Sequence, residues 1–335
     1  MSSEDALIRW LRGLQPGSGL DRPGDDAAIV GRGAAARALT TDQQVAGVHL
    51  PADLDAAVWA RRLLAVNLSD LAAMGAQPCA ALLTLAVPPG FALRRFLRAA
   101  VAACREAGVA LAGGDVARSA HAVTTMTLIG RRPRGGRWIP RRAARPGDRL
   151  WLASPVGGSA VGQRLVARGA RLTPRGVRWS PADPMPGSLR GLAELAVRRH
   201  LAPQPQLDLG RWLGTRPRAA AIDVSDGLAA DLRRLCAASG VGAVVDAGAI
   251  PIDEAARALS PRLAESALDL ALGGGEDYSL LFALPPRAAP PPRFGASAIG
   301  RIVEARGVRI ERDGHRMRVP GGWDHLRRGR ARREP

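Results

Sequence analysis

The sequence contains no lysine. All 48 of its Lys+Arg residues are arginines, and they outnumber the 30 acidic residues to give a formal net charge of +18. The phosphate-binding loop G-x-x-x-x-G-K-[ST] requires a lysine, so this class of nucleotide site is excluded. The His-Arg-Asp catalytic loop of protein kinases is absent as well. A nucleotide bound by this chain would have its charge met by metal ions, arginines and backbone amides.

Aromatic residues are also scarce, at 4% of the chain. Single-stranded nucleic acid is bound by basic grooves that carry aromatic stacking platforms, and here the arginines are scattered and the aromatics too few to accompany them. The positive charge belongs to a general enrichment in Arg, Ala, Gly and Pro, including 39 glycines and 26 prolines. The composition therefore argues against nucleic acid as the main partner. The basic run at 327–333 is interpreted as a solvated end and not as a binding arm.

Cysteines are few and do not form a framework. Cys79, Cys104 and Cys236 are odd in number, far apart and next to apolar residues, which is typical of small core residues in a reducing compartment. No apolar run approaches the roughly 20 residues needed to span a bilayer. The acidic start of the sequence does not resemble a secretory signal. We therefore expect a cytoplasmic protein with no membrane partner.

Strands and helices alternate along the 335 residues, a length that suits two domains. A basic stretch at 131–145, punctuated by Pro and Gly, is the best candidate boundary and predicts domains at 1–135 and 145–335. The fold class is therefore α/β with mixed sheets. Proline-rich loops are expected at 173–188 and 285–292. The expected strands are 27–30, 38–41, 80–87, 109–112, 123–129, 149–153, 219–224 and 241–245, and the expected helices are 56–74, 93–107, 159–167, 189–200 and 227–238.

Asp70 is an acidic residue on a buried helix face. Residues spaced three and four apart share its face, and leucines on the other face indicate that the whole helix is buried. An isolated carboxylate in such a place costs several kcal/mol unless it is protonated, paired or bound to a metal. The nearest basic residues, Arg61 and Arg62, are more than two turns away. A metal ion is therefore a serious candidate. The residues that share the face are Leu63, Val66, Asn67 and Met74.

Five further motifs place an Asp beside Gly, Ser or Thr at the edge of an apolar run. Each alone is typical of a turn or a helix cap, and Asp223 and Ser225 could simply cap the helix expected at 227–238. Together they indicate a multi-metal phosphate site, because Mg²⁺ takes carboxylate and hydroxyl oxygens along with substrate phosphates. The motifs are Gly24-Asp-Asp26, Thr40-Thr-Asp42, Gly113-Gly-Asp115, Asp223-Val-Ser-Asp226 and Gly273-Gly-Gly-Glu-Asp277.

In order and approximate spacing these motifs, with Val45-Ala-Gly-Val-His49 and Asn67-Leu-Ser-Asp-Leu-Ala-Ala-Met-Gly75, resemble those of bacterial thiamine-monophosphate kinases. The resemblance implies a two-domain fold like that of aminoimidazole ribonucleotide synthetase. The amino-terminal domains would bind ATP and Mg²⁺ and pair across a β-barrel in a homodimer, while the carboxy-terminal domain would complete the cleft. It also implies ATP- and Mg²⁺-dependent phosphorylation of thiamine monophosphate to thiamine diphosphate.

The resemblance further implies roles for individual residues. Several Mg²⁺ ions would be held by Asp26, Thr40, Thr41, Asp42, Asp70, Asp115, Asp223 and Asp226. The nucleotide would contact Gly114, Asp115, Arg141 and Ser225, and thiamine monophosphate would contact His49, Glu276 and Trp323. Without the resemblance, His49 and Trp323 could equally be ordinary core or surface residues. No catalytic base is expected, because the acceptor is a phosphate monoester that is largely dianionic at neutral pH.

Some positions depart from the family pattern. Val116 stands where Thr is common, Leu50 where Phe is common, and Ala202 and Gln206 where arginines are common. None of these changes removes an implied metal ligand, so we expect an active enzyme.

Two other interpretations stay open at the level of sequence. The first is another ATP-dependent enzyme of the superfamily, although a selenophosphate synthetase would need a reactive cysteine near the amino terminus, and the first cysteine here is Cys79. A hydrogenase-maturation relative would need a carboxy-terminal cysteine, and this chain ends in Arg-Arg-Glu-Pro335. The second is a noncatalytic nucleotide- or nucleic-acid-binding relative, which salt-sensitive DNA binding without ATP turnover would reveal.

Overall fold

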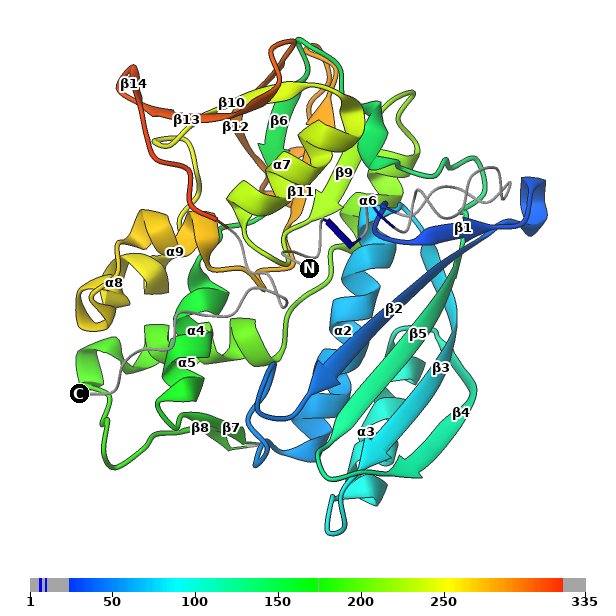
Figure 1. Ribbon diagram of the computed structural model, residues 1–335, viewed down its shortest axis with the longest axis vertical. Helices are drawn as coiled ribbons and strands as arrows, with labels where there is room; N and C mark the ends of the chain where they lie inside the picture. The colour runs from blue at the N-terminus through cyan, green and yellow to red at the C-terminus, as the bar shows by residue number, and fades with distance from the viewer. Residues whose placement is uncertain (1–5, 8–9, 11–23, 174, 322–335) are drawn as a thin grey trace.

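Two large β-sheets, with the helix α2 (Ala56–Ala73) packed against both, form the framework of the protein (Figure 1). The computed structural model describes residues 6–7, 10, 24–173 and 175–321, and Trp323 and the basic run 327–333 lie outside this part. The helix begins at Asp55, whose carboxylate accepts a hydrogen bond from the Ala57 N–H at 2.8 Å, and its first turns are thereby capped. Thirteen of its 18 residues are buried, which confirms the prediction of a largely buried helix, although Arg61 lies on an exposed side of it.

The first sheet has the strand order β1-β2-β5-β3-β4. Only β3 and β4 run parallel; the other neighbours are antiparallel. Helices α2 and α3 (Leu93–Glu106) cover one face, and the other face is open as far as the described residues go, with Leu82 on β3 44% exposed. The strands are β1 (Ala28–Val30), β2 (Arg37–Val45), β3 (Gln77–Val87), β4 (Ala110–Arg118) and β5 (Val123–Arg131).

The second sheet has the order β14-β13-β10-β12-β6-β11-β9. Helix α7 (Leu228–Ser239) packs on one face and α6 (Leu207–Gly214) on the other. Helix α6 also crosses α2 at Gly210, where a Cβ atom would lie 2.1 Å from the Ala72 carbonyl oxygen, so only glycine fits. The strands are β6 (Arg149–Leu152), β9 (Ala220–Asp223), β10 (Gly242–Asp246), β11 (Leu280–Leu284), β12 (Ser297–Val303), β13 (Gly307–Arg312) and β14 (His315–Arg316).

A group of helices and a short hairpin complete the molecule, and their apolar side chains continue the core beneath the first sheet. The hairpin falls partly within the stretch expected to be a loop at 173–188, so that expectation was wrong there. Helices α6, α8 and α9 were not predicted because seven to ten residues show too little periodicity. The elements are α4 (Gly158–Ala167), α5 (Gly187–Leu201), α8 (Glu254–Leu263), α9 (Ala267–Gly273), β7 (Arg171–Thr173) and β8 (Gly176–Arg178).

The main alternation of strands and helices follows the sequence prediction, with ends that differ by a few residues. Strands β2 and β4 are longer than expected, and residues 132–148 between the two sheets contain one short 3₁₀ helix (Arg141–Ala143). Domain limits at 135 and 145 stay a prediction. Cys79, Cys104 and Cys236 are free thiols, as expected, and the last two are buried. Within the described residues, no helix combines the length and apolar character needed to cross a bilayer.

Candidate functional site

Carboxylates from three distant parts of the chain meet beside α2. Asp26 precedes β1, Asp70 lies on α2 and Asp223 ends β9, and one oxygen of each lies within 4.8 Å of the others. Asp26 and Asp223 are buried, and Asp70 is half-buried. Three acidic groups at this spacing inside a protein can all be anions only beside compensating positive charge.

Two hydroxyl groups orient these carboxylates. Thr40 Oγ1 on β2 donates to Asp70 Oδ2 at 2.5 Å, and Ser69 Oγ on α2 donates to Asp223 Oδ2 at 2.6 Å. Because β2 side chains alternate between the two faces of the sheet, Asp42 points to the same side as Thr40. Carboxylate and hydroxyl oxygens from the first sheet and from α2 thus face the same carboxylate cluster.

Asn67, the one asparagine of the chain, connects β2 to α2 next to this point. Its Oδ1 accepts the Asp42 backbone N–H at 3.1 Å, and its Nδ2 donates to the Leu63 carbonyl at 2.8 Å. Both halves of the amide are therefore used. This hydrogen bond fixes the position of Asp42 along the axis of α2, the helix that carries Asp70.

Asp70 and Asp223 in the cluster, and Asp42 beside it, do not ionise readily on their own. Burial, and then repulsion from neighbouring carboxylates, raises the pKa of Asp70 and of Asp223 well above the usual value. Burial raises the pKa of Asp42 to about 6, although Arg62 attracts the carboxylate. Carboxylate and hydroxyl oxygens are the ligands that Mg²⁺ prefers, and a divalent cation would favour the ionised form of every acid here. The donor set therefore fits a Mg²⁺ site.

Arg141 lies at one edge of the cluster. Its guanidinium pairs with Asp26 and donates to the Gly24 carbonyl at 3.0 Å, while its backbone N–H donates to Asp25 Oδ1 at 3.0 Å. Burial lowers the pKa of Arg141, but the carboxylates around it, Asp26 first among them, more than offset this and raise it. This charged side chain therefore holds the Gly24–Asp26 turn in place.

Side chains of the next helix, α7, hold the turn after β9 in place. Asp231 Oδ2, in the first turn of α7, accepts the backbone N–H groups of Ser225 and Asp226, each at 3.0 Å. Arg234 pairs with both Asp231 and Asp226. The N-cap residue of α7 is Gly227, without a side-chain cap. The interpretation of Asp223 and Ser225 as helix caps was therefore wrong.

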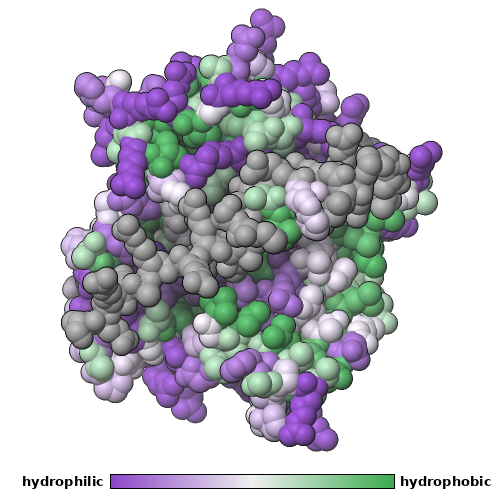
Figure 2. Space-filling model, in the orientation of Figure 1, coloured by the Kyte–Doolittle hydropathy of each residue, from purple (hydrophilic) through white to green (hydrophobic). Residues whose placement is uncertain are grey.

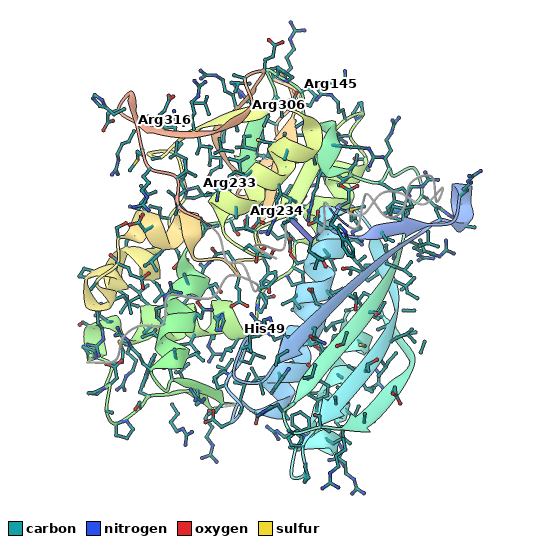
Figure 3. The ribbon with its side chains drawn as sticks, in the orientation of Figure 1. His49, Arg145, Arg233, Arg234, Arg306 and Arg316 are labelled. Atoms are coloured by element: carbon teal, nitrogen blue, oxygen red, sulfur yellow. The ribbon has the colours of Figure 1, made fainter. Side chains whose placement is uncertain are left out.

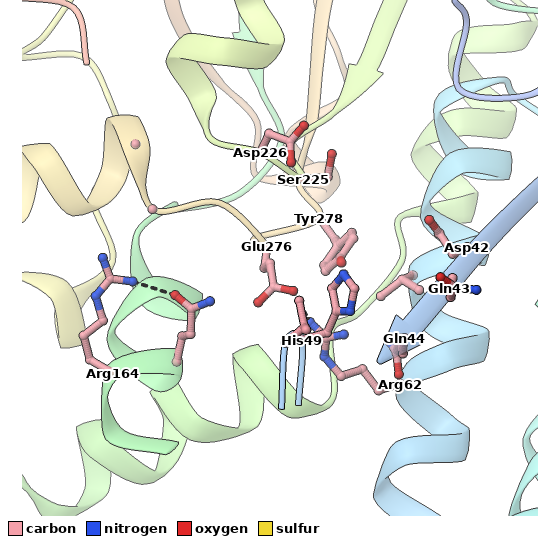
Figure 4. Close-up of a pocket in the computed structure, with 15 residues that line it drawn as sticks. Asp42, Gln43, Gln44, His49, Arg62, Arg164, Ser225, Asp226, Glu276 and Tyr278 are labelled. Atoms are coloured by element: carbon pink, nitrogen blue, oxygen red, sulfur yellow. Dashed lines mark hydrogen bonds and ion pairs between the residues drawn. The ribbon is translucent and has the colours of Figure 1, made fainter. Parts of the chain in front are cut away.

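A cavity of about 360 Å³ opens next to the carboxylates (Figure 4). Its walls come from β2, the loop after it, α2, α4, the turn after β9 and the segment before β11. Figure 3 places His49 near the middle of the molecule, whereas Arg145, Arg306 and Arg316 lie at its outer end, where Figure 2 shows a mainly hydrophilic surface. The polar and charged lining residues are Asp42, Gln43, Gln44, His49, Arg62, Gln163, Arg164, Ser225, Asp226, Glu276 and Tyr278.

His49 enters the cavity with a defined ring orientation. Its Nδ1 accepts the Val45 backbone N–H at 3.0 Å. A neutral imidazole has one acceptor and one donor nitrogen, so Nε2 carries the hydrogen in this tautomer. His49 is therefore set up to donate a hydrogen bond through Nε2.

Three of the expected site residues lie apart from the carboxylate cluster. Thr41 points to the open face of the first sheet, where its Oγ1 accepts a hydrogen bond from Thr127 at 3.1 Å. Gly114 and Asp115 lie on the edge strand β4, and β5 and β3 separate that strand from β2. A Cβ at Gly114 would lie 1.7 Å from the Leu83 carbonyl oxygen, so strand pairing alone requires this glycine.

The positions that depart from the family pattern have structural surroundings of their own. Gln206 Oε1 accepts the Leu280 backbone N–H at 3.0 Å and so connects the start of α6 to β11. Leu50 is buried, and Val116 is exposed on β4.

Sequence reasoning missed four residues that shape the site, namely Arg62, Asp231, Arg234 and Tyr278. Arg62 was noticed only as too distant to neutralise Asp70. Its charge on a mostly apolar helix was the available signal, since a buried arginine implies a buried acid. Nothing local in the sequence indicated which acid that was.

Comparison with known proteins identifies two family domains in the chain. The domain described as "AIR synthase related protein, N-terminal domain" matches residues 24–131, and its C-terminal counterpart matches residues 197–313. The thiamine-monophosphate kinase of Caulobacter vibrioides is 34% identical over 319 residues, which cover 92% of this chain and 84% of that protein. The thiamine-monophosphate kinase of Escherichia coli K12 is 34% identical over 301 residues, or 86% of each chain.

Solved structures agree with these similarities. A structure described as "AaThiL complexed with AMPPCP and TMP" has a TM-score of 0.83 at 27% identity and covers 96% of this chain and 97% of its own. The thiamine-monophosphate kinase of Stenotrophomonas maltophilia has a TM-score of 0.70 at 34% identity, covering 92% and 95%. The hydrogenase maturation protein HypE of Escherichia coli, at 19% identity, shares the fold.

Proposed function

Because the chain belongs to the thiamine-monophosphate kinase family, we propose that the carboxylate cluster and the adjoining cavity are its active site. The enzyme phosphorylates thiamine monophosphate to thiamine diphosphate with ATP as the donor. The observation that carries the assignment of the site is the meeting of Asp26, Asp70 and Asp223 beside Asp42, which itself lines a cavity large enough for a small substrate.

We propose that several Mg²⁺ ions are held here. Asp26, Asp70 and Asp223 form the centre, and Thr40, Asp42 and Asp226 add oxygens from β2 and from the turn after β9. Bound Mg²⁺ would neutralise charge on the phosphates of donor and acceptor. Asp115 would have to reach these ions from the edge strand β4. The Thr41 side chain points to the open face of the sheet, so Thr41 would contribute only through its backbone.

The chain needs no general base for this reaction. The acceptor phosphate is largely dianionic at neutral pH, so its oxygen can attack the terminal phosphorus of ATP without losing a proton. One P–O bond forms to the acceptor, and the bond to ADP breaks in line with it. The work of the protein is to position two polyanions and to hold charges beside them.

The remaining residues divide between the two substrates. We assign Gly114, Asp115, Arg141 and Ser225 to the nucleotide and His49, Glu276 and Trp323 to thiamine monophosphate. A donor at His49 Nε2 and a carboxylate at Glu276, both lining the cavity, support the assignment for the acceptor. Arg141 is supported by its charge and by its contact with Asp26 at the edge of the cluster.

We propose that two copies pair through the open face of the first sheet and close it into a β-barrel. Leu82 is a large apolar side chain exposed on that face, and Thr41 and Asp115 lie on the same face. Burial of this surface would favour association. A cytoplasmic location remains the expectation that follows from the free cysteines.

The proposal is tested by incubating the purified protein with Mg-ATP and thiamine monophosphate. Thiamine diphosphate and ADP should form in equal amounts, and reactions without Mg²⁺ or with unphosphorylated thiamine should give none. ATP hydrolysis without thiamine diphosphate would reject the proposal.

A further inference from the structure

Arg62 is a fully buried cation in the wall of the cavity, and its side chain is 1% exposed. Its Nη2 donates to Glu276 Oε1 at 2.6 Å, its Nε donates to the His200 carbonyl at 2.8 Å, and its guanidinium lies 5.9 Å from the centre of the Tyr278 ring. Figure 4 shows Arg62 next to His49 and close to Glu276. One side chain of α2 thus contacts α5 and the segment before β11.

The neighbouring arginine, Arg61, is exposed, so burial is a feature of Arg62 alone and not of both arginines. Arg61 pairs with Glu106 on the surface, where the two side chains are 47% and 61% exposed. Consecutive helical residues point about 100° apart, so Arg61 faces solvent and Arg62 faces the cavity. A buried guanidinium is tolerated only when its donors are used, and here an acid 214 residues further along the chain supplies the charge.

Glu276 is held from several sides. Its Oε2 lies 3.0 Å from His200 Nδ1, and its backbone N–H donates to the Ser225 carbonyl at 2.7 Å. Glu276 and Tyr278 both have positive φ angles, 57° and 49°, which are unfavourable for residues other than glycine. Although burial raises it, Arg62 and His200 hold the pKa of the Glu276 carboxyl well below its usual value. The segment is therefore a constrained one that presents a fixed anion to the cavity.

Helix α2 carries both Arg62 and Asp70, eight residues apart. At a rise of 1.5 Å per residue this is about 12 Å along the axis. Asp70 in the carboxylate cluster and Glu276 are therefore connected through one helix.

We propose that Arg62 is a positioning residue for the acceptor substrate, which sets the place and orientation of the Glu276 carboxylate relative to the carboxylate cluster. This inference rests on the proposed function, in which Glu276 faces thiamine monophosphate. Arg62 acts through Glu276 and is not assigned to the phosphoryl transfer itself.

The test uses four variants of the full chain: Arg62→Met, Arg62→Lys, Glu276→Gln and the double variant Arg62→Met/Glu276→Gln, with Arg61→Met as the matched control. Calorimetry measures thiamine monophosphate binding with Mg²⁺ and without nucleotide, and kinetics give KM for each substrate and kcat. We expect Arg62→Met to weaken acceptor binding and raise its KM by about tenfold, or about 1.4 kcal/mol. KM for ATP should change by less than about twofold, and Arg61→Met should behave like the wild type.

The double variant should bind the acceptor no more weakly than the weaker single variant, because both changes remove one interaction. Arg62→Lys keeps the charge but loses the planar fork, so it should lie between the wild type and Arg62→Met, and it carries the test if Arg62→Met fails to fold. Unchanged acceptor binding in the Arg62 variants, or equal losses for both substrates, would overturn the inference. A wild type that forms no thiamine diphosphate would instead reject the proposed function.

Discussion

Ser69 Oγ on α2 donates a hydrogen bond to the Asp223 carboxylate at the end of β9, at a distance of 2.6 Å. Both side chains are buried, and the two residues belong to parts of the chain 154 positions apart. Since Asp70 follows Ser69 on the helix, one turn of α2 both supplies a carboxylate and orients another from the second sheet.

We predict that Ser69→Ala lowers the Mg²⁺ affinity of the enzyme by about 10- to 100-fold, because groups that orient metal ligands have effects of this size. The activity should be recovered in part at high Mg²⁺ concentration. Mg²⁺ titrations of initial rate test this, and Ser266→Ala, which removes a side-chain cap at the far end of α9, outside the lining of the cavity, is the control. Identical Mg²⁺ dependence in wild type and Ser69→Ala would contradict the prediction.

Asp42→Asn and Asp70→Asn should each reduce kcat by at least about a hundredfold while the protein stays folded. The amide is similar in size but supplies less charge to the centre of the site. Turnover is measured at saturating Mg²⁺ and ATP, and circular dichroism checks the fold. Asp208→Asn, at an exposed acid on α6, should remain fully active. Near-normal turnover of both site variants would refute the assignments.

Mg²⁺ alone should raise the Tm of the protein by about 4 °C at concentrations near a hundred times Kd, because it binds the folded state. The shift should vanish on chelation. In metal-free buffer at pH 8, Asp70→Asn should have a higher Tm than the wild type, since the change removes a carboxylate that burial and its neighbours disfavour. A lower Tm for this variant without metal would show that the cluster is not strained by repulsion.

Asp277 predicts a pH dependence of stability. Its carboxylate accepts the backbone N–H groups of Gly157 and Ser159 at 2.9 and 3.2 Å, but burial outweighs them and raises the pKa of Asp277 to about 7. An acid whose pKa is raised in the folded state stabilises the fold when protonated, and this contribution is lost as the pH rises from about 4 through about 7.

Asp277→Asn cannot titrate at this position. The free energy of unfolding of the wild type should therefore fall relative to that of Asp277→Asn between pH 5 and pH 8, by a few kcal/mol at most. Urea unfolding of both proteins across this range is the measurement. Parallel pH curves would contradict the raised pKa.

Leu82→Glu should convert the proposed dimer into a monomer. The side chain lies on the open face of the first sheet, and a charge there would have to be desolvated at the interface. Light scattering after size exclusion gives the mass. Val101→Glu is the matched control, because Val101 is also exposed but lies on α3, which covers the opposite face. A wild type that is monomeric at all concentrations would reject the interface.

The sequence correctly predicted on which face of its own helix or strand a side chain lies. Asp70 was expected to face inward, and the structure places it beside Asp26 and Asp223. The ordered motifs also identified the family, which the comparisons confirm. These features depend on local periodicity and motif order, and both are present in the chain before it folds.

Contacts between residues that lie far apart in the sequence could not be predicted in this way. Arg62 meets Glu276, Ser69 meets Asp223, and Asp231 reaches back to the turn that was expected to cap its own helix. The packing of helices against the two sheets brings these residues together, and no spacing in the sequence indicates that they meet. The placement of Thr41 and Asp115 on the open face likewise follows from strand order.

By itself, the sequence determined the kind of chemistry: many acids beside hydroxyls and glycines, no lysine, and periodic segments that bury one face. The tertiary structure decided which acids share a site, which cation fixes Glu276, and which expected ligands lie elsewhere. The physical reason is that side-chain direction follows from local backbone geometry, whereas the distance between remote residues follows from how helices and sheets pack.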